Sequence, residues 1–92
     1  MSRYIYMITA SWCPPCRTAE RVIVPAVLQA CPGQMTVIDI IKNPSGLCRE
    51  YDVTKTPTFL LMEDGVLAEK HVGIFPRADT LIRWLKEGGA LF

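Results

Sequence analysis

Two cysteines separated by two residues are the side chains of this sequence best suited to chemistry. An apolar run precedes Cys13 and a helical pattern follows Cys16, so the pair should lie where a buried strand meets a helix N-terminus. The aligned N–H groups there favour negative charge, which lowers the pKa of a thiol. Because a thiolate is the species that attacks a disulfide, the pair indicates thiol–disulfide exchange. The full stretch is Ser11-Trp12-Cys13-Pro14-Pro15-Cys16-Arg17.

Cys31 and Cys48 complete the set of four cysteines. Four cysteines in a short secreted chain would suggest two disulfides, but no cleavage pattern follows the N-terminus, so we expect reduced thiols. We interpret Cys31, at the end of a helix, and Cys48, on a short helix, as small apolar groups. A regulatory disulfide between these two cysteines is a minority alternative.

A metal site is a weaker interpretation of the cysteines. Zinc needs four protein ligands, or three and a water. Cys13 and Cys16 supply two, whereas Cys31, Cys48 and His71 belong to other elements and form no second pair at metal-ligand spacing. We therefore expect neither zinc nor an iron–sulfur cluster, and no cofactor beyond the Cys13–Cys16 disulfide or dithiol.

The composition fits a single domain over residues 1–92. Half of the residues are apolar, which is enough for one modest core. The formal net charge is +1 and no two basic residues are adjacent, which argues against nucleic acid or a membrane surface as a partner. No apolar run is long enough to span a bilayer. We expect a cytoplasmic location and a monomer.

Apolar periodicity predicts an α/β domain with the order β-α-β-α-β-β-α. The run at 3–8 lacks alternation, as in a strand covered on both faces. A helix separates the first two strands, so these should be parallel, and an Asp64-Gly65 turn should join the last two as a hairpin. The result is a four-stranded mixed sheet. The expected strands are 3–8, 35–41, 58–62 and 67–72, and the expected helices run from Pro15 to Pro32-Gly33, over 46–51, and from Pro76 to Gly88-Gly89.

The first helix contains an internal proline. Pro25 removes one helical hydrogen bond, and we expect a kink rather than an end because the apolar period continues past it. Asn43 or Ser45 should cap the short second helix. We interpret His71 as a solvated side chain of the edge strand, and Trp84 as part of the core or helix surface. The predicted apolar face of the first helix consists of Ala19, Val22, Ile23, Ala26, Val27 and Ala30.

The order of elements and the cysteine motif together resemble the thioredoxin family over nearly the whole chain. A CxxC motif alone is a weak signal, but one that follows a buried strand and has a Thr-Pro-Thr downstream is specific. The matching residues are Trp12-Cys13, Pro15-Cys16-Arg17, Asn43-Pro44, Thr56-Pro57-Thr58, Asp64-Gly65 and Val72-Gly73.

The resemblance implies a thioredoxin-like fold with strand order 2-1-3-4 and a protein-disulfide reductase activity. Cys13 would be the nucleophile that forms a mixed disulfide with the target, and Cys16 would resolve it. The peptide bond before Pro57 is cis in this family, which would place the Thr56 backbone beside Cys13, where it could pair with an extended substrate. The substrate groove implied by the resemblance consists of Trp12, Thr56, Pro57, Gly73 and Ile74.

The resemblance also implies partners. These are disulfide-containing proteins as substrates and, as electron donor, either a thioredoxin reductase-like flavoprotein or glutathione.

Three positions depart from the family pattern. Met7 stands where the family has a buried acid thought to assist proton transfer to the second cysteine, Val37 where it has that acid's lysine partner, and Thr9 where members often have a tryptophan. We therefore expect Cys16 to use water or a substrate group as its base, with Glu20 as a fallback. The family's extra N-terminal strand and helix are also missing, so the chain looks like a minimal, divergent member.

Two other functions stay open. Pro14 is typical of glutaredoxins, so a glutaredoxin-like electron donor, for example to ribonucleotide reductase, is one alternative. Against it, Thr56-Pro57 and Gly73-Ile74-Phe75 lack the glutathione-binding features of that family. The other alternative is a non-catalytic docking subunit, and the intact dithiol together with Thr56-Pro57 argues against it.

Overall fold

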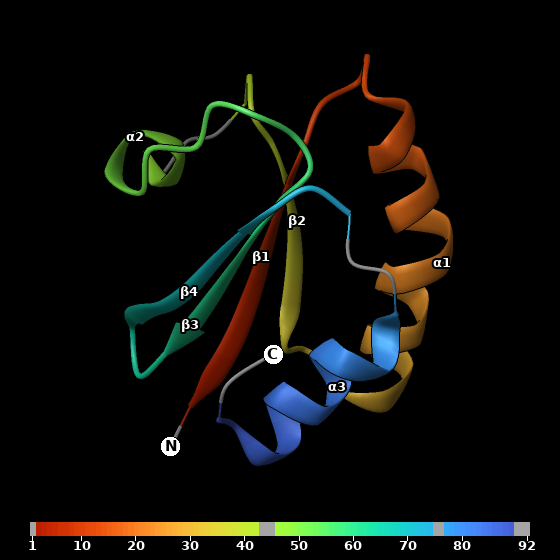
Figure 1. Ribbon diagram of the computed structural model, residues 1–92, viewed down its shortest axis with the longest axis vertical. Coiled ribbons are helices and arrows are strands. Elements are labelled where there is room, and N and C mark those ends of the chain that lie inside the picture. Colours follow the sequence, from red (N-terminus) through yellow and green to blue (C-terminus); the bar gives the residue numbers. More distant parts are fainter. Residues whose placement is uncertain (1, 43–45, 75–76, 90–92) are drawn as a thin grey trace.

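The computed structural model describes residues 2–42, 46–74 and 77–89. Its element order is the predicted β-α-β-α-β-β-α, and no helix among the described residues is both long and apolar enough to cross a membrane (Figure 1). The elements are β1 (Arg3–Thr9), α1 (Pro14–Ala30), β2 (Met35–Asp39), α2 (Leu47–Glu50), β3 (Thr58–Glu63), β4 (Val66–Val72) and α3 (Ala78–Glu87).

The four strands form one mixed sheet in the order β2-β1-β3-β4, as predicted. β1 is parallel to β2 and antiparallel to β3, which in turn is antiparallel to β4. Asp64 and Gly65 have φ values of 52° and 81°, so both central residues of the β3–β4 turn adopt the left-handed conformation that this tight hairpin requires. β1 is therefore an inner strand, and its end lies at the centre of the sheet.

The sheet separates two apolar clusters. Ile5 and Met7 of β1 belong to the larger cluster, under α1 and α3, whereas Ile8 belongs to the smaller one, against which Tyr4 and Tyr6 pack. This alternation follows from the two-residue period of a strand. In Figure 1, α1 and α3 lie on one side of the sheet and α2 on the other. Cys31 lies in the larger cluster and Cys48 packs against the smaller one, so the alternative of a disulfide between them is wrong.

The predicted apolar face of α1 is partly wrong. Val22 is 62% exposed and Ala30 is exposed, whereas Val24 is buried. Val22 and Val24 project about 200° apart around a helix axis, so only one of them can face the core. The helix continues through Pro25, as predicted, and ends at Ala30. Cys31 is its C-cap, and the Cys31 N–H donates to the Val27 carbonyl at 2.7 Å.

The ends of other strands and helices differ from the predicted ones by a few residues. β2 ends at Asp39 rather than Ile41, because the Asp39 side chain accepts the Ile41 N–H at 2.8 Å and turns the chain. The N-cap of α2 is Gly46, and the predicted caps Asn43 and Ser45 lie outside the described residues. So does Pro76, the predicted start of the last helix.

Two single-residue interpretations are settled by burial. His71 is half-buried, with its ring centroid 6.4 Å from that of Phe59, so the prediction of a solvated side chain is wrong. It lies opposite Phe59 in the β3–β4 register, on the face that α3 helps to cover. Trp84 is buried in the larger cluster, so its interpretation as a core residue is confirmed.

Candidate active site

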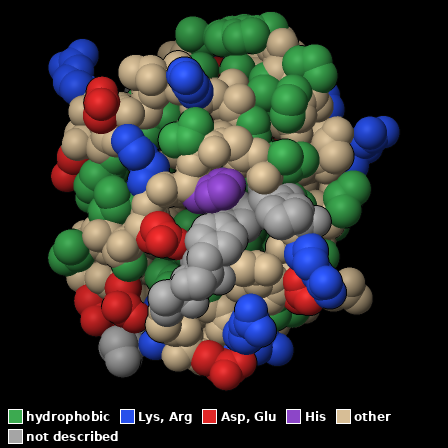
Figure 2. All heavy atoms as spheres, in the orientation of Figure 1, with side chains coloured by type: hydrophobic (Ala, Val, Ile, Leu, Met, Phe, Trp, Pro, Cys, Tyr) green, Lys and Arg blue, Asp and Glu red, His purple; other side chains and the backbone are tan. Residues whose placement is uncertain are grey.

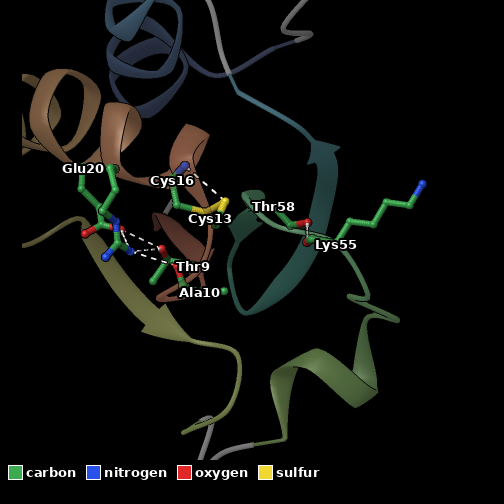
Figure 3. The surroundings of a disulfide bond; sticks show 8 residues. Thr9, Ala10, Cys13, Cys16, Glu20, Lys55 and Thr58 are labelled. Carbon is green, nitrogen blue, oxygen red and sulfur yellow. Dashed lines mark hydrogen bonds and ion pairs between the residues drawn. A yellow bond between two sulfur atoms is a disulfide. The ribbon is translucent and has the colours of Figure 1, made fainter.

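Cys13 and Cys16 form a disulfide at the N-terminus of α1, with their Cα atoms 5.2 Å apart. β1 ends at Thr9, and a short turn follows in which the Cys13 N–H donates to the Ala10 carbonyl at 3.3 Å. This turn leaves Cys13 with an extended backbone as the N-cap of α1, while Cys16 lies in the first turn of the helix. The strand-to-helix junction expected from the sequence is therefore present (Figure 3).

The helix N-terminus provides a hydrogen bond to the Cys13 sulfur. The Cys16 N–H donates to Cys13 Sγ at 3.3 Å. Pro14 and Pro15 occupy the first two helical positions and have no N–H, so Cys16 is the first helical residue that can donate. The positive end of the helix dipole lies at the same place, and both effects stabilise a thiolate on Cys13.

The two sulfurs differ in their access to solvent. Cys13 is 6% exposed and Cys16 is fully buried. A reagent or substrate can therefore approach Cys13 first, and Cys16 can reach only a partner already attached there. This arrangement fits the order of attack that the family resemblance implies.

The predicted groove residues lie on three segments. Trp12 adjoins Cys13 and is 65% exposed, and Ile74 is also exposed. The Thr56–Pro57 peptide bond is cis, and the Gly73 N–H donates to the Pro57 carbonyl at 2.8 Å, which brings the end of β4 against this segment. Figure 2 shows hydrophobic side chains gathered at the upper end of the face in view, near the start of α1.

A hydrogen bond from the Thr58 side chain holds the backbone that contains Thr56 and Pro57. Thr58 is buried, and its hydroxyl donates to the Lys55 carbonyl at 2.6 Å. Figure 3 draws this hydrogen bond in the surroundings of the disulfide, with the Lys55 side chain extending away from the sulfur atoms. The turn before β3 thus has a side-chain hydrogen bond of its own.

A polar network that the sequence did not predict ties α1 to the end of β1. Glu20 Oε2 accepts hydrogen bonds from the Thr9 hydroxyl and from the Arg17 guanidinium, both at 2.7 Å. Arg17 also donates to the Ala10 carbonyl at 3.0 Å and to Thr9 Oγ1 at 3.2 Å (Figure 3). We call Thr9, Arg17 and Glu20 the loop network. The spacing of Arg17 and Glu20 by three helical positions was its one visible signal.

A family model described as Thioredoxin matches residues 2–87. The chain belongs to the thioredoxin family. It is 36% identical over 73 residues to Thioredoxin H-type of Oryza sativa subsp. indica, a match covering 79% of this chain and 57% of that protein. It is also 36% identical over 70 residues to mitochondrial Thioredoxin-3 of Saccharomyces cerevisiae, covering 75% and 54% respectively. The chain thus spans little more than half the length of these relatives.

Solved thioredoxin structures confirm the fold class. Oxidised mitochondrial thioredoxin 3 of Saccharomyces cerevisiae superposes with a TM-score of 0.75 at 28% identity, covering 94% of this chain and 78% of that one. A structure concerned with the thiol resolving mechanism of yeast mitochondrial 1-Cys peroxiredoxin has the same TM-score at 26% identity and the same coverage.

The two positions at which the family resemblance implies a buried acid and its lysine partner form an apolar pair. Met7 is fully buried in β1 and lies opposite Val37 of β2 in the parallel register. Neither side chain can accept or hold a proton. The loop network supplies a carboxylate at Glu20, whose Oε2 already accepts from Thr9 and Arg17.

The described residues contain no group of three or more His, Cys, Asp or Glu side chains that could hold a metal ion.

Proposed function

We propose that this thioredoxin-family chain is a thiol–disulfide oxidoreductase that reduces disulfides in proteins. The observation that carries the proposal is the placement of Cys13 Sγ, which caps α1 and accepts the Cys16 N–H, while the Cys16 side chain lies buried behind it. A thiolate at this position is stabilised, and its resolving partner is one helical turn away.

The reaction is a two-electron exchange in two steps. The Cys13 thiolate attacks one sulfur of the target disulfide, that S–S bond breaks, and the leaving sulfur takes a proton. Cys16 then loses its proton and attacks Cys13 Sγ, which releases the second target sulfur as a thiol. The target gains two electrons and two protons, and the protein ends with the Cys13–Cys16 disulfide.

The substrate is proposed to bind as an extended segment across Trp12, Thr56, Pro57, Gly73 and Ile74. Trp12 and Ile74 are exposed and would offer apolar contact to the substrate. The Thr56 backbone N–H and carbonyl would pair with the substrate backbone, as when a strand adds to a sheet edge.

The remaining properties are proposals of the same kind. Electrons would come from a thioredoxin reductase-like flavoprotein or from glutathione, and we propose a monomer that acts in the cytoplasm. One of its relatives is mitochondrial, so the location needs its own measurement. The reduction potential decides the direction of exchange, because dithiols of this kind range from about −270 to about −120 mV.

Insulin reduction by dithiothreitol tests the activity directly. The protein should accelerate insulin precipitation, and Cys13→Ser should abolish the acceleration. Cys16→Ser should instead accumulate a mixed disulfide with insulin that non-reducing electrophoresis detects. Cys48→Ser is the control and should behave like the wild type. If the wild type is as inert as Cys13→Ser, the chain is a docking module and the proposal is wrong.

A second comparison separates this function from a glutaredoxin-like one. Reduction of the Cys13–Cys16 disulfide is followed with NADPH and a flavin-dependent thioredoxin reductase, and separately with reduced glutathione. We expect the flavoprotein to be the faster donor. Efficient turnover with glutathione alone would favour the glutaredoxin-like electron donor.

A further inference from the structure

A pocket of about 450 Å³ lies on the opposite face of the sheet from the disulfide. Tyr4 and Tyr6 of β1 line it, together with Glu50 and Tyr51 at the end of α2 and Met62 of β3. Binding sites for small ligands fall between about 300 and 1,000 Å³, so the pocket can hold one side chain or a small molecule. The proposed disulfide chemistry uses none of these residues.

Three of the lining side chains are tyrosines. The Tyr4 and Tyr6 ring centroids are 5.0 Å apart and their planes are tilted by 53°. A hydrogen bond between the Tyr4 hydroxyl and Thr36 Oγ1 fixes the first ring. Tyr51, from α2, adds a third ring. Such rings present negative faces that attract a cation within about 6 Å.

The charge of the pocket is negative. Of the described residues that line it, Glu50 alone carries a formal charge. Burial, the negative charge of Glu50 and a side-chain hydrogen bond with Glu50 all raise the pKa of Tyr51 above its ordinary value. The nearby cation Lys70 does not line the pocket, because its ammonium group donates to the Tyr51 and Asp52 carbonyls at 3.1 and 3.2 Å.

We propose that this pocket binds an alkylammonium group, supplied either by a lysine side chain of a polypeptide or by a free amine. The ammonium would lie against the tyrosine rings and pair with the Glu50 carboxylate, while its aliphatic stem would contact Leu47 and Met62. Glu50 is exposed and has a side-chain hydrogen bond with Tyr51, so its carboxylate lies at the mouth of the pocket. A neutral ligand would gain no Coulomb attraction to this carboxylate, and an anion would be repelled by it. The cation is thus the class of ligand that satisfies both the rings and the carboxylate.

Titration of the oxidised full chain, followed by amide NMR shifts, tests this assignment. The probes are n-butylammonium, Nα-acetyl-lysine methylamide and the neutral Nα-acetyl-norleucine methylamide. We expect the cations to shift the amides of Leu47–Tyr51 and of β1. Glu50→Gln and Tyr6→Leu should each weaken binding by about fivefold to tenfold. Glu87→Gln, which removes an exposed carboxylate from α3, is the matched control and should change affinity less than twofold.

Each outcome decides a specific point. Equal binding of n-butylammonium and the lysine derivative supports recognition of the alkylammonium group itself. Tighter binding of n-butylammonium supports a free amine, and tighter binding of the lysine derivative supports a polypeptide. The assignment is overturned if no probe binds, if norleucine binds as well as lysine, or if Glu50→Gln and Glu87→Gln weaken binding equally. Insulin reduction should stay at the wild-type rate in Glu50→Gln, since the pocket and the disulfide lie on opposite faces of the sheet.

Discussion

Replacing Glu20 with alanine should destabilise the protein, because Glu20 is the acceptor at the centre of the loop network. The mutation removes the ion pair between Glu20 and Arg17, whose side chains are 31% and 48% exposed, respectively. Ion pairs with this degree of exposure contribute about 0.2–1 kcal/mol to stability. It also leaves the hydroxyl group of buried Thr9 without its Glu20 acceptor. Leaving a buried donor unsatisfied costs about 1–3 kcal/mol of stability. Alanine returns a few tenths of a kcal/mol in helix propensity, roughly. The net loss should therefore be about 2 kcal/mol.

Thermal and urea unfolding of the oxidised protein measure this loss. For a domain of this size, about 2 kcal/mol corresponds to a fall in Tm of roughly 10 °C. Glu20→Gln keeps an oxygen that can accept from Thr9 and should lose only about half as much. Arg21→Ala, at the next and exposed position of α1, controls for helix propensity and should stay within about 0.5 kcal/mol of the wild type.

A double-mutant cycle with Thr9→Val isolates the Thr9–Glu20 hydrogen bond. If that bond exists, the two mutations should couple by about 1 kcal/mol. Strictly additive effects, or a loss in Glu20→Ala no larger than that in Arg21→Ala, would refute the loop network. The same variants test Glu20 as the proton acceptor for Cys16, since an unchanged pH profile of insulin reduction in Glu20→Gln excludes that role.

Three further substitutions test the burial of Met7, the packing at Gly88 and the hydrogen bonding of Cys13. Met7→Asp places a carboxylate at a fully buried apolar position and should lower the stability by about 3 kcal/mol or more. The loss should appear as a lower midpoint of urea unfolding, and an unchanged midpoint would contradict the burial of Met7. Gly88→Ala directs a Cβ into the Arg3 guanidinium, which an ion pair with Glu63 holds in place. It should therefore lower Tm by more than Gly89→Ala, which shares the positive φ but meets nothing within 4 Å. Pro15→Ala adds an N–H at the second helical position and should speed alkylation of reduced Cys13 by about threefold to tenfold, whereas Pro14→Ala should not.

The sequence was sufficient to predict the elements because each has a local signal. Residues 4–8 of β1 form a continuous apolar run, and Asp64-Gly65 favours a turn with two positive φ values, which the structure has. The apolar run before Cys13 and the helical pattern after Cys16 likewise predicted that the pair lies at a helix N-terminus, as the structure has it. Helix rotation was less predictable, since Val22 and Val24 are equally apolar and only the packing of α1 decides which is buried.

Contacts between distant polar residues could not be predicted. The loop network joins Thr9 to Glu20, and nothing in the sequence indicates which residue accepts the hydrogen bond of the Thr9 hydroxyl. The pocket on the α2 face likewise depends on how α2 lies over Tyr4 and Tyr6. In each case the chain supplies the residue types, and the fold decides which of them meet.

β1 contributes residues to both the disulfide side and the pocket side of the sheet, because its side chains point alternately to the two faces. Its odd-numbered residues Met7 and Thr9 face α1, with Thr9 bonded to Glu20, whereas Tyr4 and Tyr6 face α2 and line the pocket. A slip of one residue in its pairing would turn Tyr4 and Tyr6 toward α1 and would turn Ile5 and Met7 toward α2. Substitutions that keep the register should therefore affect one site at a time. Tyr6→Leu should weaken cation binding while leaving insulin reduction intact, and Thr9→Val should leave cation binding intact.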